Sequence, residues 1–251
     1  MFNFFVNENS LTENGYEIIG SDYNHIKNVL RMKVGEQLLV SYNGKSDLCC
    51  IEDFYDDKVI VSISEKNYRN CELPIEIHLF QGLPKNDKLE LIIQKTVELG
   101  VTEIYPVEMK RCVVKLDDKK KNSKVTRWQA IAESAAKQSK RNIIPKVSTV
   151  LSFSDMLDIA KELDLFIVPY ECKDGMKSTK EAFKKIKKGM KIGILIGSEG
   201  GFDDGEIEKV SAMGAEIISL GGRILRTETA AITAVSAVML YSELYIGGED
   251  E

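Results

Sequence analysis

Two glycine-rich loops, each following a short apolar strand, constrain this chain more than any other feature. The first is the stretch Ile192–Phe202, in which an apolar run ends in Gly197, Gly200 and Gly201. The second follows the apolar segment Glu216–Leu220 and contains two further adjacent glycines. Each loop opens a predicted helix. Loops at the carboxyl ends of strands form the small-molecule site of an open α/β sheet, so this region predicts both the fold class and the place of the site.

Strands and helices alternate from Ile75 onward, which predicts an α/β domain with a mostly parallel sheet and right-handed crossovers. The expected strands are Ile75–Phe80, Glu103–Val107, Leu165–Val168, Ile192–Ile196 and Glu216–Leu220. The expected helices begin near the capping residues Asn86, Asp203 and Thr227, run from Arg127 to about Ser139, and cover Lys177–Lys187. Glu206 stands three residues after Asp203, a spacing typical of a capping box.

The final predicted helix, from Thr227 to about Tyr245, is apolar on nearly all sides. Such a helix is buried on most of its surface. Either its own sheet or a second subunit can cover it, and the sequence slightly favours a second subunit.

Residues 1–73 predict a separate small β-barrel domain. Gln37–Tyr42 and Asp47–Phe54 read as strands joined by the turn Asn43-Gly44, a strong hairpin signal. A short helix is expected to begin at Ser21-Asp22 and to reach Arg31. The polar segment 66–74 reads as a linker, so the predicted domains are 1–73 and 74–251.

Positive charge is concentrated in two stretches, although the whole chain carries a net charge of −5. Residues 110–146 hold 12 Lys and Arg against three acids, and residues 173–191 hold eight Lys against two acids. A clustered positive surface is typical of proteins that bind a polyanion. Taken alone, the pattern also fits a solvated lysine-rich face.

Several classes of protein are disfavoured. The five cysteines, Cys172 among them, show no CxxC spacing, and only two histidines exist, so a zinc site or a Ser-His-Asp triad is not expected. No apolar run reaches the roughly 18 residues of a membrane span. The N-terminus lacks a basic region and a cleavage site, so a cytoplasmic protein is expected.

The chemistry of the loops favours a nucleoside-type ligand over a polyphosphate. A glycine loop at a helix N-terminus first suggests phosphate. However, neither GxxxxGK[ST] nor GxGxxG is present, and Glu199 would repel a polyphosphate. Apolar Ile224 and Leu225 in the second loop suit a flat heteroaromatic ring whose edge is bonded by the backbone. The absent dinucleotide fingerprint also disfavours an oxidoreductase.

Both loops resemble the signature of the ribosomal RNA small-subunit methyltransferase E family. The resemblance lies in Ile196–Phe202 and Leu220–Ala230, and it extends to His25–Arg31, Lys88–Val101 and Glu133–Arg141. It implies an enzyme of the SPOUT class that uses S-adenosyl-L-methionine to methylate N3 of a uridine in 16S ribosomal RNA. It also implies a deep trefoil knot in the α/β domain, a PUA-like RNA-binding barrel before it, and a homodimer.

The resemblance and the loop chemistry together give a set of expected site residues. Cofactor contacts are expected from Ile196, Gly197, Glu199, Gly200, Gly201, Leu220, Gly221, Ile224, Leu225, Arg226, Thr229 and Ala230. Arg226 and Arg223 can stabilise charge on the uracil, while Glu199 or Glu228 can accept a proton or hold those arginines. RNA contacts are expected from Arg31, Arg111, Lys115, Arg127, Lys137 and Arg141.

Two positions depart from the family pattern, and one alternative function stays open. Ser198 stands where the family commonly has Pro, and Asn3 stands near a position where it commonly has Arg. The alternative is a non-catalytic RNA-binding factor for ribosome assembly on the same fold. Such a protein would bind RNA with a steep salt dependence but would never methylate it.

Overall fold

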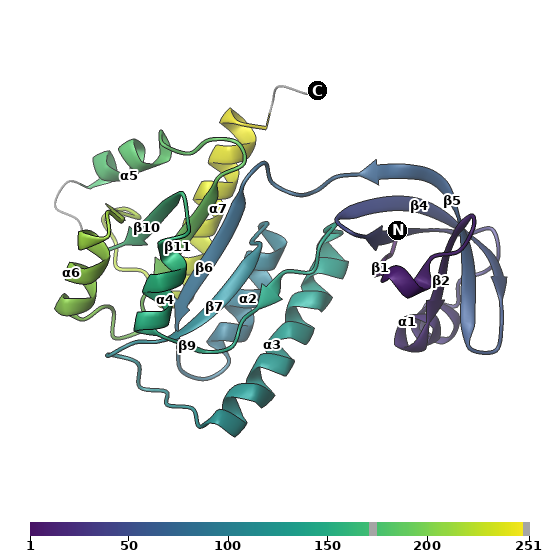
Figure 1. The fold of residues 1–251 in the computed structure, drawn as a ribbon, viewed down its shortest axis with the longest axis horizontal. Helices are drawn as coiled ribbons and strands as arrows, with labels where there is room; N and C mark the ends of the chain where they lie inside the picture. Colours follow the sequence, from purple (N-terminus) through teal and green to yellow (C-terminus); the bar gives the residue numbers. More distant parts are fainter. Residues whose placement is uncertain (171–174, 248–251) are drawn as a thin grey trace. The chain divides into compact units, whose positions relative to one another are not determined.

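The computed structural model describes residues 1–170 and 175–247 and divides into two compact units (Figure 1). The first unit comprises Met1–Glu72 together with Ala136–Ile144, and the second comprises Leu73–Ala135 and Pro145–Glu251. No described helix is long and apolar enough to cross a membrane.

The first unit is a five-stranded sheet in the order β1-β3-β4-β5-β2 that surrounds one apolar cluster. Its strands are β1 (Asn3–Phe5), β2 (Gly15–Ile19), β3 (Gln37–Tyr42), β4 (Lys45–Phe54) and β5 (Lys58–Arg69). Only the β1–β3 pair is parallel. The hairpin between β3 and β4 turns at Asn43 and Gly44, both with positive φ, as the sequence predicts.

The expected short helix is present, but its start, one additional strand and the linker differ from what the sequence predicts. The helix α1 (Gly20–Asn24) starts one residue before Ser21, has no side-chain cap, and continues as a π-helical turn over His25–Val29. Strand β2 was not expected, because its residues carry no clear alternation. Strand β5 extends to Arg69, into the segment expected to be a linker, because it pairs with β4 along its length.

The segment between Ala136 and Ile144 is held in the first unit by a buried ion pair. Arg141, only 2% exposed, donates from Nε to Glu72 Oε2 at 3.0 Å. The backbone N–H of Asn142 donates to Glu72 Oε1 at 2.7 Å. Asn3 donates from its side chain to the Arg141 carbonyl at 2.9 Å, so this departure from the family pattern is a buried structural contact.

The second unit contains a seven-stranded sheet in which every ladder between described residues is parallel. The order is β12-β10-β11-β6-β7-β8, and β9 also pairs with β7. The strands are β6 (Glu76–Gly82), β7 (Glu103–Glu108), β8 (Lys146–Val147), β9 (Leu151–Ser152), β10 (Leu165–Pro169), β11 (Lys191–Ile196) and β12 (Glu216–Ile218). The predicted parallel α/β sheet is therefore confirmed, with two short strands added.

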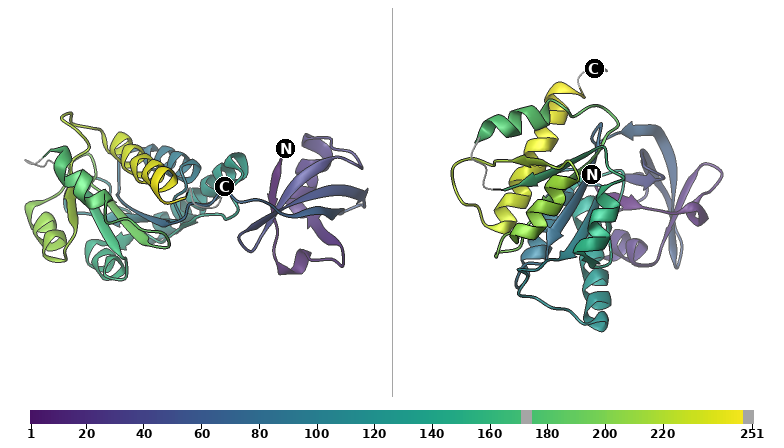
Figure 2. Two further views of the ribbon diagram at one scale, coloured as in Figure 1. Left: turned by 90° about the horizontal axis from the view of Figure 1, so that it is seen from above. Right: turned by 60° about the vertical axis from the view of Figure 1, so that its left-hand side comes forward.

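Helices cover both faces of this sheet (Figure 2). The helices α2 and α7 lie side by side on one face, and α4 and α6 pack on the other against an apolar cluster that includes Phe80, Met156 and Val210. The helices among the described residues of this unit are α2 (Lys88–Glu98), α3 (Asp118–Ser139), α4 (Phe153–Ala160), α5 (Met176–Phe183), α6 (Asp204–Ala212) and α7 (Thr227–Tyr245).

The starts of these helices test the capping predictions. The capping box of Asp203 and Glu206 is present in both directions, as the sequence predicts. Asn86 is not the cap of α2, because the helix begins after Asp87. Helix α3 begins nine residues before Arg127, through a lysine-rich run that contains no breaker. Helix α4 was missed, and Thr227 is the first residue of α7 rather than its cap.

We expect Arg141→Met to destabilise the protein by about 3 kcal/mol, because it leaves the Glu72 carboxylate without its buried cation. The measurement is urea denaturation followed by circular dichroism. Lys161→Met is the matched control, since Lys161 pairs with Asp158 at a site where both side chains are more than half exposed. The control should change stability by less than about 1 kcal/mol, and equal effects of the two variants would contradict the structural role of Arg141.

Candidate functional site

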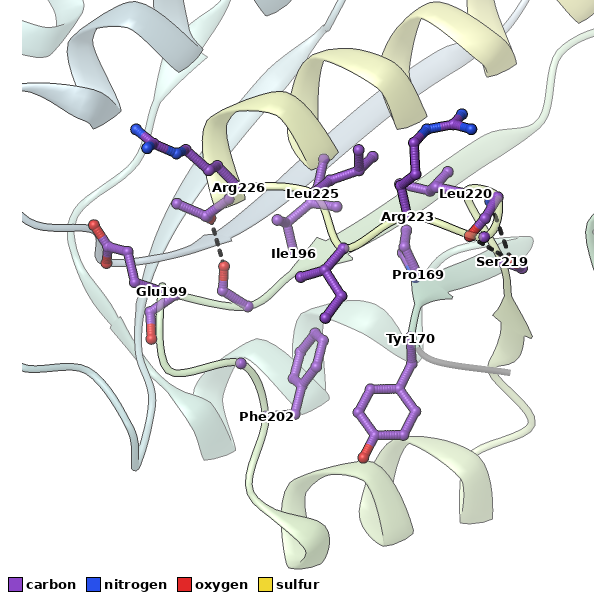
Figure 3. Close-up of a pocket in the computed structure, with 18 of the residues that line it drawn as sticks. Pro169, Tyr170, Ile196, Glu199, Phe202, Ser219, Leu220, Arg223, Leu225 and Arg226 are labelled. Atoms are coloured by element: carbon purple, nitrogen blue, oxygen red, sulfur yellow. Dashed lines mark hydrogen bonds between the residues drawn. The ribbon is translucent and has the colours of Figure 1, made fainter. Parts of the chain in front are cut away.

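A cavity of about 810 Å³ lies at the carboxyl ends of β10, β11 and β12 (Figure 3). Both glycine loops line it, together with Pro169 at the end of β10, Tyr170 after it, and Thr227 and Ala230 at the start of α7. Figure 3 shows Glu199 and Arg226 at one end of the cavity and Tyr170 and Ser219 at the other. The volume falls within the usual range for small-molecule and cofactor sites.

The first loop runs close to other backbone. A Cβ on Gly197 would lie 3.1 Å from the carbonyl carbon of Gly201, and a Cβ on Gly82 would lie 2.7 Å from the Ser198 nitrogen. Gly201 has φ of +67° with nothing within 4 Å of its Cβ position, so it faces open space in the cavity. These glycines let the loop fold tightly and leave its backbone accessible to a ligand.

The second loop is fixed at its base and exposed at its tip. Thr179 of α5 donates its hydroxyl to the Ser219 carbonyl at 2.6 Å, and the Ser219 hydroxyl accepts from the Gly221 N–H at 3.1 Å. Beyond Gly221, whose φ is +104°, the Ile224 side chain is fully exposed at 102%. An apolar side chain held in water at the rim of a cavity is available to cover a ligand.

A hydrogen bond joins the first loop to the start of α7. Thr227 donates its hydroxyl to the Gly197 carbonyl at 2.6 Å, so the start of α7 is attached to the first loop. Gln81, at the end of β6, donates to the same hydroxyl at 2.9 Å and to the Gly197 carbonyl at 3.3 Å. Neither Thr227 nor Gln81 was expected as a site residue, because no local motif marks either one.

Lys88 of α2 lies between two carboxylates at the edge of the cavity. Its Nζ is 2.9 Å from Glu199 Oε1 and 3.5 Å from Glu228 Oε2. Glu199 also accepts from the Lys85 N–H at 3.0 Å. Burial raises the pKa of Glu199, but the hydrogen bond from Lys88 and two backbone N–H groups outweigh it, and the pKa ends below its ordinary value. Glu199 is therefore an ionised partner of Lys88 at neutral pH.

The cavity brings together most of the predicted cofactor residues. The lining contains Ile196, Gly197, Glu199, Gly201, Leu220, Gly221, Ile224, Leu225, Arg226 and Ala230, and also Arg223, which was expected to act on the uracil. Gly200, Glu228 and Thr229 do not line it. Arg223 and Arg226 are exposed and form no ion pair with any residue that the structure describes.

The residues expected to contact RNA fall into two groups. Arg31, Arg111 and Lys115 are exposed. The other three are engaged within their own unit: Arg127 pairs with Glu90 at 2.7 Å, Lys137 pairs with Asp22 at 2.9 Å, and Arg141 is buried against Glu72. The basic stretch 173–191 begins with two residues, 173 and 174, that lie outside the described part of the chain, and Cys172 also lies outside it. Among the described residues, no His, Cys, Asp and Glu cluster could hold a metal ion.

Comparison with known protein families gives the class of this protein. The family described as the RNA methyltransferase domain matches residues 71–239, and the RNA methyltransferase PUA domain matches residues 18–64. The fold and the cavity therefore belong to an RNA methyltransferase with a PUA-like N-terminal domain.

Relatives and solved structures narrow the class to one family. The ribosomal RNA small subunit methyltransferase E of Bacillus subtilis is 41% identical over 238 residues, 93% of each chain. A putative methyltransferase of Legionella pneumophila, solved with its cofactor SAM, has a TM-score of 0.78, 31% identity, and covers 95% of this chain and 97% of its own. A ribosomal RNA small subunit methyltransferase E of Neisseria gonorrhoeae, solved with S-adenosyl methionine bound, has a TM-score of 0.76 and 30% identity. The match covers 94% of this chain and 96% of that chain. The chain belongs to the ribosomal RNA small subunit methyltransferase E family.

Gly82→Ala should disturb the first loop, because its Cβ would lie 2.7 Å from both the Ser198 nitrogen and the Met109 sulfur. We expect a loss of about 1–3 kcal/mol in unfolding free energy, the usual cost of overpacking. Gly205→Ala is the control: its Cβ would meet only Asp203 Oδ1 at 3.5 Å, within a helix that favours Ala. Thermal unfolding of the two variants measures the difference, and a neutral Gly82→Ala would refute the tight packing.

Proposed function

We propose that this chain transfers a methyl group from S-adenosyl-L-methionine to N3 of a uridine in 16S ribosomal RNA. The observation that carries the proposal is the glycine-lined cavity in a chain 41% identical to a ribosomal RNA small subunit methyltransferase E. The two solved relatives named above, each with S-adenosyl methionine bound, support the cofactor. The uridine and its N3 atom follow from the family resemblance, and the ribosomal substrate implies a cytoplasmic protein.

The cavity fits this cofactor. Backbone at Gly201 and Leu220 can bond the edge of an adenine ring, and Ile196, Phe202 and Leu225 give apolar surface for its faces. Glu199 and Lys88 provide charges at one end for the amino-acid portion or the sulfonium. When bound, S-adenosyl-L-methionine supplies an electrophilic methyl group on a sulfonium. The role of the chain is to hold the acceptor in line with that methyl group.

Arg226 and Arg223 are the proposed stabilisers of the uracil as it loses its N3 proton. Both lie on the second loop at the rim of the cavity and are exposed, so their guanidinium groups can reach a base presented there. Cations near a developing anion are the main electrostatic contribution to such a transfer. Glu199 and Glu228 both face Lys88, which supports positioning roles for them rather than a free base.

RNA binding is assigned to Arg31, Arg111 and Lys115, because these three predicted contacts are exposed. Arg127 and Lys137 can contribute if phosphate replaces their carboxylate partners. An RNA contact by Arg141 would require breaking the buried pair with Glu72, so a structural role is favoured for it. Such cationic contacts hold the RNA backbone without reading its sequence.

The knot and the homodimer are further parts of the proposal. After β12, at the edge of the sheet, the chain returns through the second loop to place α7 beneath β6 and β11, a path that supports a knotted arrangement of the two loops. Leu240 and Leu244 are exposed one turn apart on α7, and with the neighbouring exposed Tyr245 they support pairing with a second copy.

Isothermal titration of S-adenosyl-L-methionine should show one binding site per subunit in the wild-type protein. Gly201→Trp should abolish it, because the indole would fill the open space that Gly201 faces in the cavity. Gly214→Ala is the control, since Gly214 also has positive φ with open space at Cβ but lies outside the cavity. Absence of binding at millimolar cofactor to the wild-type protein would refute the proposed function.

Arg226→Ala should lower kcat for transfer of labelled methyl to small-subunit RNA about 10²-fold, the usual cost of removing a donor to a developing anion. Binding of the cofactor should change much less than kcat. Lys161→Ala, an exposed cation outside the cavity, is the control for general charge effects. If the wild-type protein binds RNA but no methyl reaches it, the chain is instead a non-catalytic RNA-binding factor.

A further inference from the structure

The second-last residue of β6 is a completely buried glutamine that contacts two residues of the cavity wall. Gln81 is 0% exposed, pairs in register with Ile196 of β11, and does not itself line the cavity. Its side-chain nitrogen Nε2 donates to the Gly82 carbonyl at 2.9 Å, to the Thr227 hydroxyl at 2.9 Å and to the Gly197 carbonyl at 3.3 Å. One amide group thus contacts β6, the first loop and the first turn of α7.

The surrounding acceptors fix the orientation of this amide. With Nε2 facing the two carbonyls, all the contacts are hydrogen bonds. The flipped amide would instead direct its oxygen at the Gly82 and Gly197 carbonyls, which cannot donate. The Thr227 hydroxyl already donates to Gly197, so it has no proton left for a second acceptor. Only the orientation with Nε2 inward is therefore compatible with the site.

This orientation leaves the other half of the amide unsatisfied. Gln81 Oε1 is one of two buried side-chain N or O atoms without a hydrogen bond among the described residues. Such atoms are rare in native proteins because each one carries an uncompensated loss of solvation. Methionine would have nearly the same length and would avoid that cost. The unfavourable oxygen therefore indicates that the three Nε2 contacts have a purpose beyond stability.

The contacts of Gln81 connect the two loops that line the cavity. The Gly197 carbonyl belongs to the first loop, where the chain turns back so closely that a Cβ on Gly197 would meet Gly201 at 3.1 Å. Thr227 directly follows Arg226, the last residue of the second loop. Gln81 bridges the two, so its amide limits how far one loop can move from the other.

We infer that Gln81 is a positioning residue for the cofactor, holding the two loops at the separation that the ligand requires. The inference rests on the proposed function of the cavity. Without the amide, the loops would populate other separations, and the ligand would have to restore the binding arrangement at the expense of its affinity. Gln81 therefore acts through Gly197 and Thr227 and not by contact with the ligand.

The test uses Gln81→Met and Thr227→Val, which remove the amide and the hydroxyl with little change of shape, and the double variant. Calorimetric titration of S-adenosyl-L-methionine should show affinity reduced about tenfold in each single variant. The double variant should lose less than the product of the two single losses, because both groups belong to one network. Thr227→Ser, which keeps the hydroxyl, should bind like the wild type.

Thr96→Val is the matched control for loss of a buried hydroxyl. Thr96 is 0% exposed on α2 and donates within its own helix to the Ile92 carbonyl at 2.7 Å, away from both loops. This variant should lose thermal stability but keep its cofactor affinity. In the methyl-transfer assay, Gln81→Met should raise KM for the cofactor and leave KM for RNA unchanged.

Each outcome decides between the proposals. If the wild-type protein does not bind the cofactor, the proposed function fails. If the wild type binds and both Gln81→Met and Thr227→Val bind equally well, the positioning role is wrong while the function stands. Equal losses of affinity in Thr96→Val would show general destabilisation and would also overturn the inference. Should Gln81→Met not fold, Thr227→Val and Thr227→Ser test the hydroxyl to which Gln81 donates, and equal cofactor affinity of the two would overturn the inference.

Discussion

The second unit depends on one hydrogen bond, from the Thr227 hydroxyl to the Gly197 carbonyl at 2.6 Å. It joins residues 30 positions apart and ties the start of the last helix to the end of a central strand. Because the bond is buried, breaking it would leave the Gly197 carbonyl with only the longer bond from Gln81 at 3.3 Å, at a cost of about 1 kcal/mol. Both glycine loops are thereby attached to one point, and the cavity between them has a defined shape.

The parts of this arrangement with a local cause could be predicted from the sequence. The apolar run before the first glycine loop predicted the parallel strand β11, because a strand buried on both faces needs no alternation. Asp203 and Glu206 form the expected capping box because both partners lie within one turn. Likewise, the turn at Asn43 and Gly44 follows from the positive φ that those two residues tolerate.

The contacts between residues far apart in the sequence could not be predicted. A threonine before an apolar run is a typical N-cap. Here, however, the Thr227 hydroxyl donates to the Gly197 carbonyl, and the N-cap residue of α7 is Arg226, whose side chain makes no capping hydrogen bond. Arg141 lies in a basic stretch typical of an RNA-binding surface, but Glu72, distant in sequence, buries it. For Gln81 nothing nearby in sequence indicates a partner. In each case the side chain finds its partner through tertiary structure, which no local pattern records.

Departures from ordinary folding rules gather around the same cavity. Gln81 Oε1 and Glu228 Oε2 are buried oxygens without a hydrogen bond among the described residues, and Ile224 is an apolar side chain fully exposed to water. Each feature is unfavourable for stability taken alone. Natural sequences agree with their folds at most positions and depart from that agreement mainly at functional sites. The unfavourable features are therefore an independent physical argument, separate from any family resemblance, that the region between the two loops was selected for binding rather than for stability.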